Sequence, residues 1–157
     1  FALPDASIVF TDGMVELAEN DNELIAVAYH EVGHLHHRHL LRRIIQSSTI
    51  AIVVFVVTGD VSSFDVIAGL PALLIDLAYS RGFEREADNY ALRSMVAAGI
   101  DIDHFANMMR RLEAHYQGEA PENETSTTHS SGMGTLRRYL ATHPAAEDRA
   151  ELIEAYR

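Results

Sequence analysis

Apolar positions in the first third of the chain follow helical spacing. From Ile25 to Leu35 they recur every three or four residues, and His39 continues the same spacing, which is that of one face of an α-helix. Asp21 precedes this stripe as a candidate N-cap, and the β-rich run 7–11 before it predicts a strand. A second face of the same helix carries His30 and His34. A helix that is apolar on one face and rich in histidine on another is expected to be buried around a polar group.

Helical patterns dominate the rest of the chain. A helix is predicted over residues 82–98, with Gly99 as its C-cap, and a second from Asp101 or Asp103 to about residue 117. Residues 118–134 are polar and predict a flexible loop, and a last helix is expected near 145–156. The fold class is therefore mainly α (α+β), as one domain over 1–157 with a small N-terminal edge strand or hairpin.

Residues 44–79 are unusually apolar. The stretches 50–57 and 66–79 lie between flanking arginines and contain almost no charge. Neither stretch reaches the roughly 20 residues that a membrane span needs. One interpretation is a buried helical hairpin. The other is a surface that contacts a membrane or a partner protein, because unbroken apolar runs are hard to cover in a small domain.

Charge and composition exclude several classes of protein. The formal net charge of −11 argues against a nucleic-acid partner, since phosphate binding needs clustered Lys and Arg. The chain has no cysteine, so disulfides, thiolate metal sites and a cysteine nucleophile are excluded. It begins at Phe1 without a charged leader, so we expect it to be a fragment of a longer protein.

Residues 30–34, His-Glu-Val-Gly-His, match the pattern H-E-x-x-H. On a helix, side chains four residues apart lie on one face with Cβ atoms about 5–6 Å apart. His30 and His34 can therefore converge on one tetrahedral zinc ion, with Zn–N distances of about 2.0–2.1 Å. Glu31 lies beside the ion and is expected to take a proton from the zinc-bound water as that water attacks a carbonyl.

A catalytic zinc needs a third protein ligand and an open position. The metzincin pattern would require Gly at position 37 and His at position 40, which are His37 and Leu40 here. The alternative is a glutamate on a separate helix. Glu84 and Asp88 share a helical face, so Glu84 can bind the ion while Asp88 accepts the remaining N–H of a ligand histidine. Glu86 is a rival that points elsewhere and is expected to be solvated.

Four ordered blocks resemble the HtpX-like gluzincin peptidases, a group that also contains CAAX prenyl endopeptidases and periplasmic chaperone-proteases. These blocks cover most of the chain: residues 1–13, FALPDASIVFTDG; HEVGH with Arg38 and His39; SRGFEREAD at 80–88; and Thr142-His143-Pro144 with Arg149. The resemblance implies a zincin-like helical metalloprotease domain that holds one Zn²⁺ and acts on polypeptides. It also implies a membrane-associated or periplasmic location in the cell envelope of a bacterium.

The resemblance implies roles for individual residues as well. Glu84 becomes the third ligand. His143 either hydrogen-bonds the developing oxyanion or binds the zinc in a resting state. Arg149 is expected to pair with a carboxylate near the site, or to form a plain surface ion pair. An alternative function is a zinc-holding chaperone or adaptor domain whose site is plugged and inactive.

The remaining histidines are expected to be solvated or part of the core: His36, His37, His39, His104, His115 and His129. His37 is the exception to watch, since it lies one turn beyond His34 on the metal-facing side. We also expect an extended substrate to add to the edge strand at 8–11 through main-chain hydrogen bonds. Binding of that kind favours extended, misfolded or membrane-associated chains.

Overall fold

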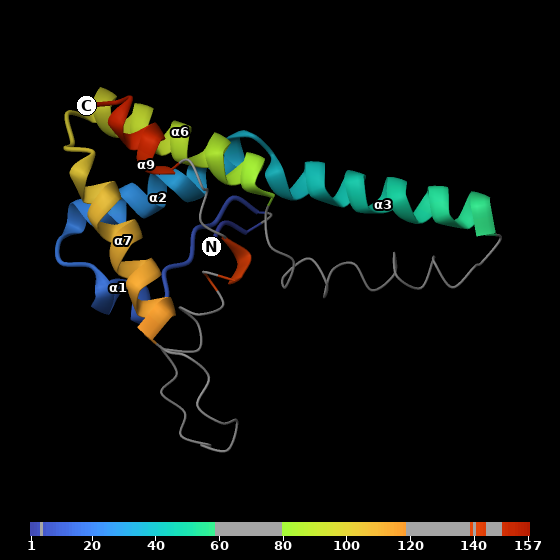
Figure 1. The fold of residues 1–157 in the computed structure, drawn as a ribbon, viewed down its shortest axis with the longest axis horizontal. Helices are drawn as coiled ribbons and strands as arrows, with labels where there is room; N and C mark the ends of the chain where they lie inside the picture. The colour runs from blue at the N-terminus through green and yellow to red at the C-terminus, as the bar shows by residue number, and fades with distance from the viewer. Residues whose placement is uncertain (4, 59–79, 119–138, 140, 144–148) are drawn as a thin grey trace, which may run out of the picture.

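The computed structural model describes residues 1–3, 5–58, 80–118, 139, 141–143 and 149–157. Helices make up most of this part of the chain (Figure 1): α1 Asp12–Leu17, α2 Asp21–His36, α3 His39–Thr58, α6 Arg81–Ala98, α7 Asp103–Gly118 and α9 Arg149–Glu154. The mainly α prediction is confirmed. The predicted flexible loop, the apolar stretch 66–79 and the start of the predicted last helix lie outside the described residues, apart from Gly118 in α7.

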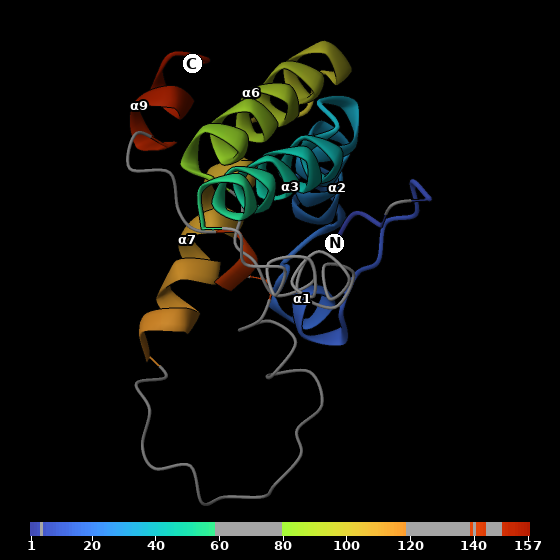
Figure 2. The same ribbon diagram turned by 90° about the vertical axis from the view of Figure 1, so that its right-hand side faces the viewer.

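Helices α2 and α6 lie side by side and form the central pair (Figures 1 and 2). Gly33 of α2 allows this close approach. A Cβ at position 33 would lie 2.9 Å from the Ala87 Cα and 3.1 Å from the Tyr90 Cβ. The absence of a side chain at Gly33 therefore brings the helix that carries H-E-x-x-H against the helix that carries Glu84.

The hydrophobic core lies between α2, α6 and α7. Its largest fully buried side chains are Leu92, Met95, Phe105, Met108 and Leu112. Their burial alternates with polar positions at helical spacing, as expected for amphipathic helices packed on a common interior. The core thus fixes how α2 and α6 face each other.

Helix ends follow local chemistry. Asn20, not Asp21, is the N-cap of α2: its backbone is extended and its side chain accepts the Glu23 amide. Asp21 instead occupies the first turn, so the predicted cap was wrong by one residue, because either residue type can cap a helix. Gly99 ends α6 with φ of +68°, a left-handed conformation that favours glycine. The predicted end of that helix is confirmed.

The N-terminus forms a small hairpin, and the run 7–11 is not a regular strand. Within the described residues, this segment pairs through one antiparallel bridge between Ala2 and Ile8. Val9 and Phe10 are exposed beyond the bridge. Two extended segments this short cannot build a stable sheet by themselves.

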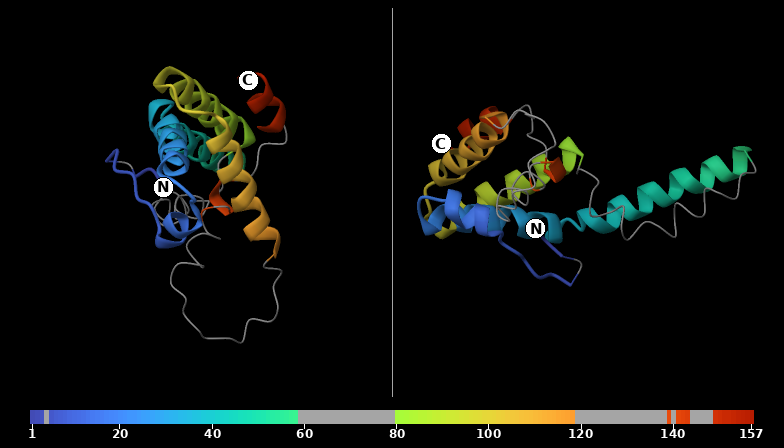
Figure 3. Two further views of the ribbon diagram at one scale, coloured as in Figure 1. Left: turned by 90° about the vertical axis from the view of Figure 1, so that its left-hand side faces the viewer. Right: turned by 90° about the horizontal axis from the view of Figure 1, so that it is seen from below.

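The predicted helical stripe breaks after His36. Arg38 has a φ of +53°, which is uncommon for a residue with a side chain, and the chain resumes as α3 at His39. Helix α3 then extends away from the other helices (Figures 1 and 3). Apolar side chains along it are exposed, with Val56 at 73% and Val57 at 79%. Within the stretch 50–57 these are the side chains that the structure describes, so the choice between a buried hairpin and a contact surface for 44–79 stays a prediction. None of the helices in the described ranges is both long and apolar enough to cross a membrane.

Candidate metal centre

Three segments bring the predicted site residues together. Helix α2 supplies His30, Glu31 and His34, α6 supplies Glu84 across the Gly33 contact, and His143 comes from the segment 139–143. All five side chains are buried. Residues far apart in the sequence thus share one interior position between α2 and α6.

Four of these side chains form a tight cluster. One nitrogen or oxygen of each lies within 4.8 Å of the others, and the four are His30, His34, Glu84 and His143. The Nε2 atoms of His30 and His34 are 3.0 Å apart. Glu84 faces both histidines, with Oε2 3.4 Å from His30 Nε2 and Oε1 3.3 Å from His34 Nε2. The Nδ1 of His143 lies 3.2 Å from Glu84 Oε1.

A carboxylate and a guanidinium fix the tautomer of His30. Its Nδ1–H donates to Asp88 Oδ1 at 2.9 Å, because a carboxylate can only accept. Asp88 in turn accepts from Arg149 Nε at 2.7 Å, and this pair is buried. Position 149 therefore forms a buried ion pair. With Nδ1 carrying the proton, neutral His30 presents the lone pair of Nε2 to the cluster.

His34 has a different partner on its outer side. Its Nδ1 lies 2.9 Å from Nδ1 of His39, whose Nε2 lies 3.0 Å from Glu86 Oε2. Glu86 also accepts from Arg42 Nη1 at 2.6 Å. Glu86 points away from the four-residue cluster and is 40% exposed, as predicted, but the chain break at residue 38 also brings His39 and Arg42 into contact with it. His37 lies in the same place, 3.8 Å from Glu86, and outside the four-residue cluster.

The pKa values show where the centre holds positive charge. Burial opposes the charged form of His30, but hydrogen bonds to Asp88 and Glu84 outweigh it and raise its pKa to about 10. For His34, burial dominates and lowers the pKa to about 4. The chain alone therefore keeps one proton between the two Nε2 atoms, donated by His30 and accepted by His34. A positive charge is stable at this position.

The donor set fits a divalent metal ion at the same position. Two imidazole lone pairs and a carboxylate are ligands that zinc accepts. Oε2 of Glu84 is buried and has no hydrogen-bond partner among the described residues. Despite burial, which raises it, the pKa of Glu84 is held well below its usual value by the three surrounding histidines. The centre is thus preorganised for a cation.

Glu31 lies beside the cluster and outside the four ligand candidates. Its Oε2 accepts the Ala2 amide at 2.8 Å, and its Oε1 lies 3.7 Å from His143 Nε2. Although burial raises it, the pKa of Glu31 is lowered overall by the charge of His143 and His30. An ionised carboxylate held next to a metal site can accept a proton.

Tyr139 is a neighbour of this carboxylate that sequence reasoning missed. Its ring stacks on His143 at a centroid distance of 4.5 Å. Burial first, and then the negative charge of Glu31 and Glu84, raise its pKa well above the usual value. The phenol therefore stays protonated. No motif in the sequence singles out this position, because it depends on the contact of Tyr139 with His143, which lies against Glu31 of α2.

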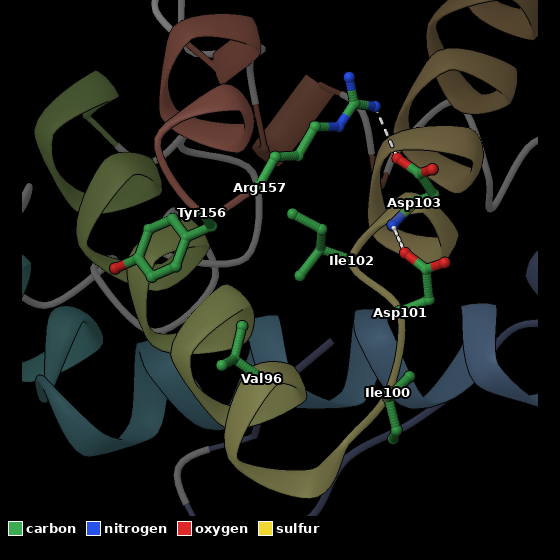
Figure 4. Close-up of a pocket in the computed structure, with 7 residues that line it drawn as sticks. All are labelled: Val96, Ile100, Asp101, Ile102, Asp103, Tyr156 and Arg157. Carbon is green, nitrogen blue, oxygen red and sulfur yellow. Dashed lines mark hydrogen bonds and ion pairs between the residues drawn. The ribbon is translucent and has the colours of Figure 1, made fainter.

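Two pockets differ in their relation to the cluster. An apolar pocket of about 360 Å³ adjoins His34, lined by Ala2, Leu3, His34, Leu35, Arg38, Leu40, Leu41 and Ile44. Another, of about 340 Å³, lies at the other end of α6 beside Tyr156 (Figure 4). There Arg157 donates to Asp103, and Asp101 accepts the Asp103 amide. Of the two, the apolar pocket is the one that adjoins the four-residue cluster.

Metallopeptidases combine metal ligands of this kind with a nearby ionised glutamate. This mainly helical domain buries both. The chain belongs to Peptidase family M48, whose family model matches residues 1–157. The predicted family relationship is thereby confirmed. Members of this family act on polypeptides and use a metal ion.

Relatives come from several lineages. The chain is 29% identical to a mitochondrial metalloendopeptidase OMA1 of Arabidopsis thaliana, over 98% of this chain and 28% of that protein. It is 26% identical to a beta-barrel assembly-enhancing protease of Yersinia pestis, over 78% of this chain and 28% of that protein. It is 28% identical to a protease HtpX homolog of Methylibium petroleiphilum, over 96% of this chain and 60% of that protein. The chain thus spans less than two thirds of each of these relatives. No solved structure matches it.

Proposed function

We propose that this chain is a zinc-dependent endopeptidase domain in which His30, His34 and Glu84 hold one Zn²⁺. The observation that carries the proposal is the 3.0 Å approach of two imidazole Nε2 atoms that both face Glu84. Two imidazoles at that distance share one cation, which is a proton in the metal-free chain and can be replaced there by a metal ion. Membership in a metallopeptidase family supports the same role.

Glu31 is the proposed general base. When bound, zinc supplies Lewis-acid chemistry, polarising the scissile carbonyl and making a water molecule easier to deprotonate. The Ala2 amide holds Oε2 of Glu31 and leaves Oε1 directed toward His143. Glu31 can therefore accept a proton from the attacking water and pass it to the leaving amine.

The substitution Glu31→Gln tests this role. The variant should keep zinc, because Gln preserves the shape of the side chain and Glu31 is not a proposed ligand. Casein cleavage should fall by about 10²–10⁴-fold, the usual contribution of a general base. Glu16→Gln, an exposed glutamate on α1, is the matched control and should cleave at the wild-type rate. Cleavage by Glu31→Gln at the wild-type rate would exclude Glu31 as the base.

The role of His143 distinguishes two candidate functions of the chain. Its place within the four-residue cluster favours either a donor to the oxyanion or a ligand that closes the site. The second option corresponds to a latent zinc-holding domain with chaperone or adaptor function. His143→Ala separates them, since casein cleavage falls if the imidazole stabilises the oxyanion and rises if it blocks zinc. Wild-type chain that binds zinc but gives no chelator-sensitive cleavage supports the latent domain.

The apolar pocket beside His34 suggests which substrates bind. We propose that it accepts an apolar side chain next to the scissile bond, while the substrate backbone runs along the N-terminal hairpin. Extended segments of misfolded or membrane-associated proteins expose such side chains. A membrane-associated or envelope location is part of this proposal.

A peptide-library digest tests the pocket. Wild-type protein should cleave many sequences, with an apolar preference at one position. Leu41→Glu, which places a charge in the pocket wall, should weaken that preference. Val15→Glu, at an equally exposed position on α1, should leave the profile unchanged. Cleavage restricted to a single sequence would count against binding through the main chain.

A further inference from the structure

The buried side chain of His39 contacts His34 on the side facing away from the proposed metal. We propose that His39, held by Glu86, positions His34: it selects the tautomer that leaves Nε2 free for zinc and fixes the plane of the ring. This inference rests on the proposed zinc site and adds two positioning residues to it. His39 is fully buried, whereas its partner Glu86 is 40% exposed.

A break between α2 and α3 creates this contact. In a continuous helix, residues 34 and 39 would lie about 140° apart around the axis and could not touch. Arg38 adopts a φ of +53°, which ends α2 and redirects the chain. The ring of His39 then packs on Phe83 at a centroid distance of 4.4 Å with the planes 4° apart. An uncommon backbone conformation thus occurs where it brings a further imidazole against His34.

The polarity of the hydrogen bonds follows from Glu86. A carboxylate only accepts, so the Nε2 of His39 at 3.0 Å must carry a hydrogen. In the neutral imidazole the other nitrogen, Nδ1, is then an acceptor. At 2.9 Å from it, Nδ1 of His34 is the donor. His34 therefore keeps its hydrogen on Nδ1 and offers the Nε2 lone pair toward His30.

The two proposed histidine ligands are supported in parallel ways. His30 donates to Asp88, which pairs with Arg149. His34 donates to His39, and the hydrogen bonding continues to Glu86, which accepts from Arg42 at 2.6 Å. In each case, a chain of directed hydrogen bonds ends on a guanidinium. Outer partners of this kind orient metal ligands and raise their basicity.

The same residues also suggest a rival, a second metal site. His37, His39 and Glu86 each offer an atom within 4.8 Å of the others. Two observations disfavour a metal there. The Nε2 of His39 carries a hydrogen and has no lone pair to give, and the guanidinium of Arg42 already neutralises Glu86. Metal stoichiometry distinguishes the two readings.

The test measures zinc affinity by chelator competition in the complete chain. His39→Phe keeps a flat ring against Phe83 and removes both nitrogens, and should weaken zinc binding by about 10- to 100-fold. His39→Asn returns an oxygen acceptor near the position of Nδ1 and should recover part of that affinity. Glu86→Ala should lose less zinc affinity than His39→Phe. The double variant should match His39→Phe within about twofold, because Glu86 acts through His39.

The matched control is His36→Phe, an exposed histidine in the last turn of α2. His36→Phe should bind zinc like wild type. If position 39 has a purely structural role, His39→Asn should recover none of the zinc affinity that His39→Phe loses. Equal affinity of wild type and His39→Phe overturns the positioning role while leaving the zinc site intact. A second equivalent of zinc that Glu86→Ala removes would favour the rival site instead. A wild-type chain that binds no zinc would refute the proposed function itself, and this inference with it.

Discussion

Gly33→Ala tests whether the close contact between α2 and α6 builds the site. The added Cβ would lie 2.9 Å from the Ala87 Cα and 3.0 Å from its carbonyl oxygen. Carbon atoms in contact prefer about 3.5–4.0 Å, so the helices must separate by roughly 0.6–1.1 Å. Both atoms of Ala87 belong to the backbone, and no rotamer change can relieve the clash.

The magnitude follows from two opposing terms. Forcing a methyl group into a packed interface costs about 1–3 kcal/mol, while replacing glycine by alanine inside a helix gains about 0.8–1.0 kcal/mol. Gly82 provides the matched control, because the nearest atom to its added Cβ is the Ser80 hydroxyl at 3.9 Å. Gly33→Ala should therefore be less stable than Gly82→Ala by about 1–3 kcal/mol.

Urea denaturation of the zinc-free variants measures this difference, and chelator competition measures zinc affinity. Ala87 lies between Glu84 and Asp88 on α6, so a displaced helix also moves both carboxylates away from His30. We expect weaker zinc binding in Gly33→Ala and wild-type binding in Gly82→Ala. Equal stability and equal zinc affinity of the two variants would refute the packing argument.

Three further predictions address the charges and the chain break. Arg149→Met removes one of the two cations that contact buried Asp88, while protonated His30 stays bound to it, and urea denaturation of the metal-free chain should show a loss of about 1–3 kcal/mol; an unchanged midpoint would contradict the buried pair. Zinc binding at pH 7 should release about one proton, because His30 has a pKa of about 10 without metal, and calorimetry in buffers of different ionisation enthalpy measures it. Because folding raises the pKa of His30, its protonated imidazole stabilises the metal-free chain fully below pH 6.5. This stabilisation is lost as the pH rises through about 10. Arg38→Asn should match or exceed wild-type stability while Arg38→Val should be less stable, because Asn tolerates positive φ and a β-branched residue does not; the reverse order would contradict a strained left-handed residue.

Local patterns in the sequence were sufficient for part of this protein. The helical stripe from Ile25 to Leu35 predicts α2, and Gly99 predicts the end of α6, because periodicity and caps depend on residues a few positions apart. The spacing of His30 and His34 puts both imidazoles on one helix face for the same reason. Glu84 and Asp88 follow from the same i, i+4 rule on a second helix.

Tertiary structure decided everything that depends on contacts between segments. The side of α6 that faces α2 depends on the close approach at Gly33, and the place of His143 depends on its contacts with Glu31 and Glu84, which are distant in the sequence. His39 and Glu86 looked like ordinary polar positions, since a continuous helix would keep residue 39 away from His34. The positive φ of Arg38 ends that helix and brings His39 against His34. The ring of His39 is then held by packing on Phe83. The helical period gives the face of a single helix on which a side chain lies. The candidate site joins side chains from several segments, so its geometry depends on how those segments pack.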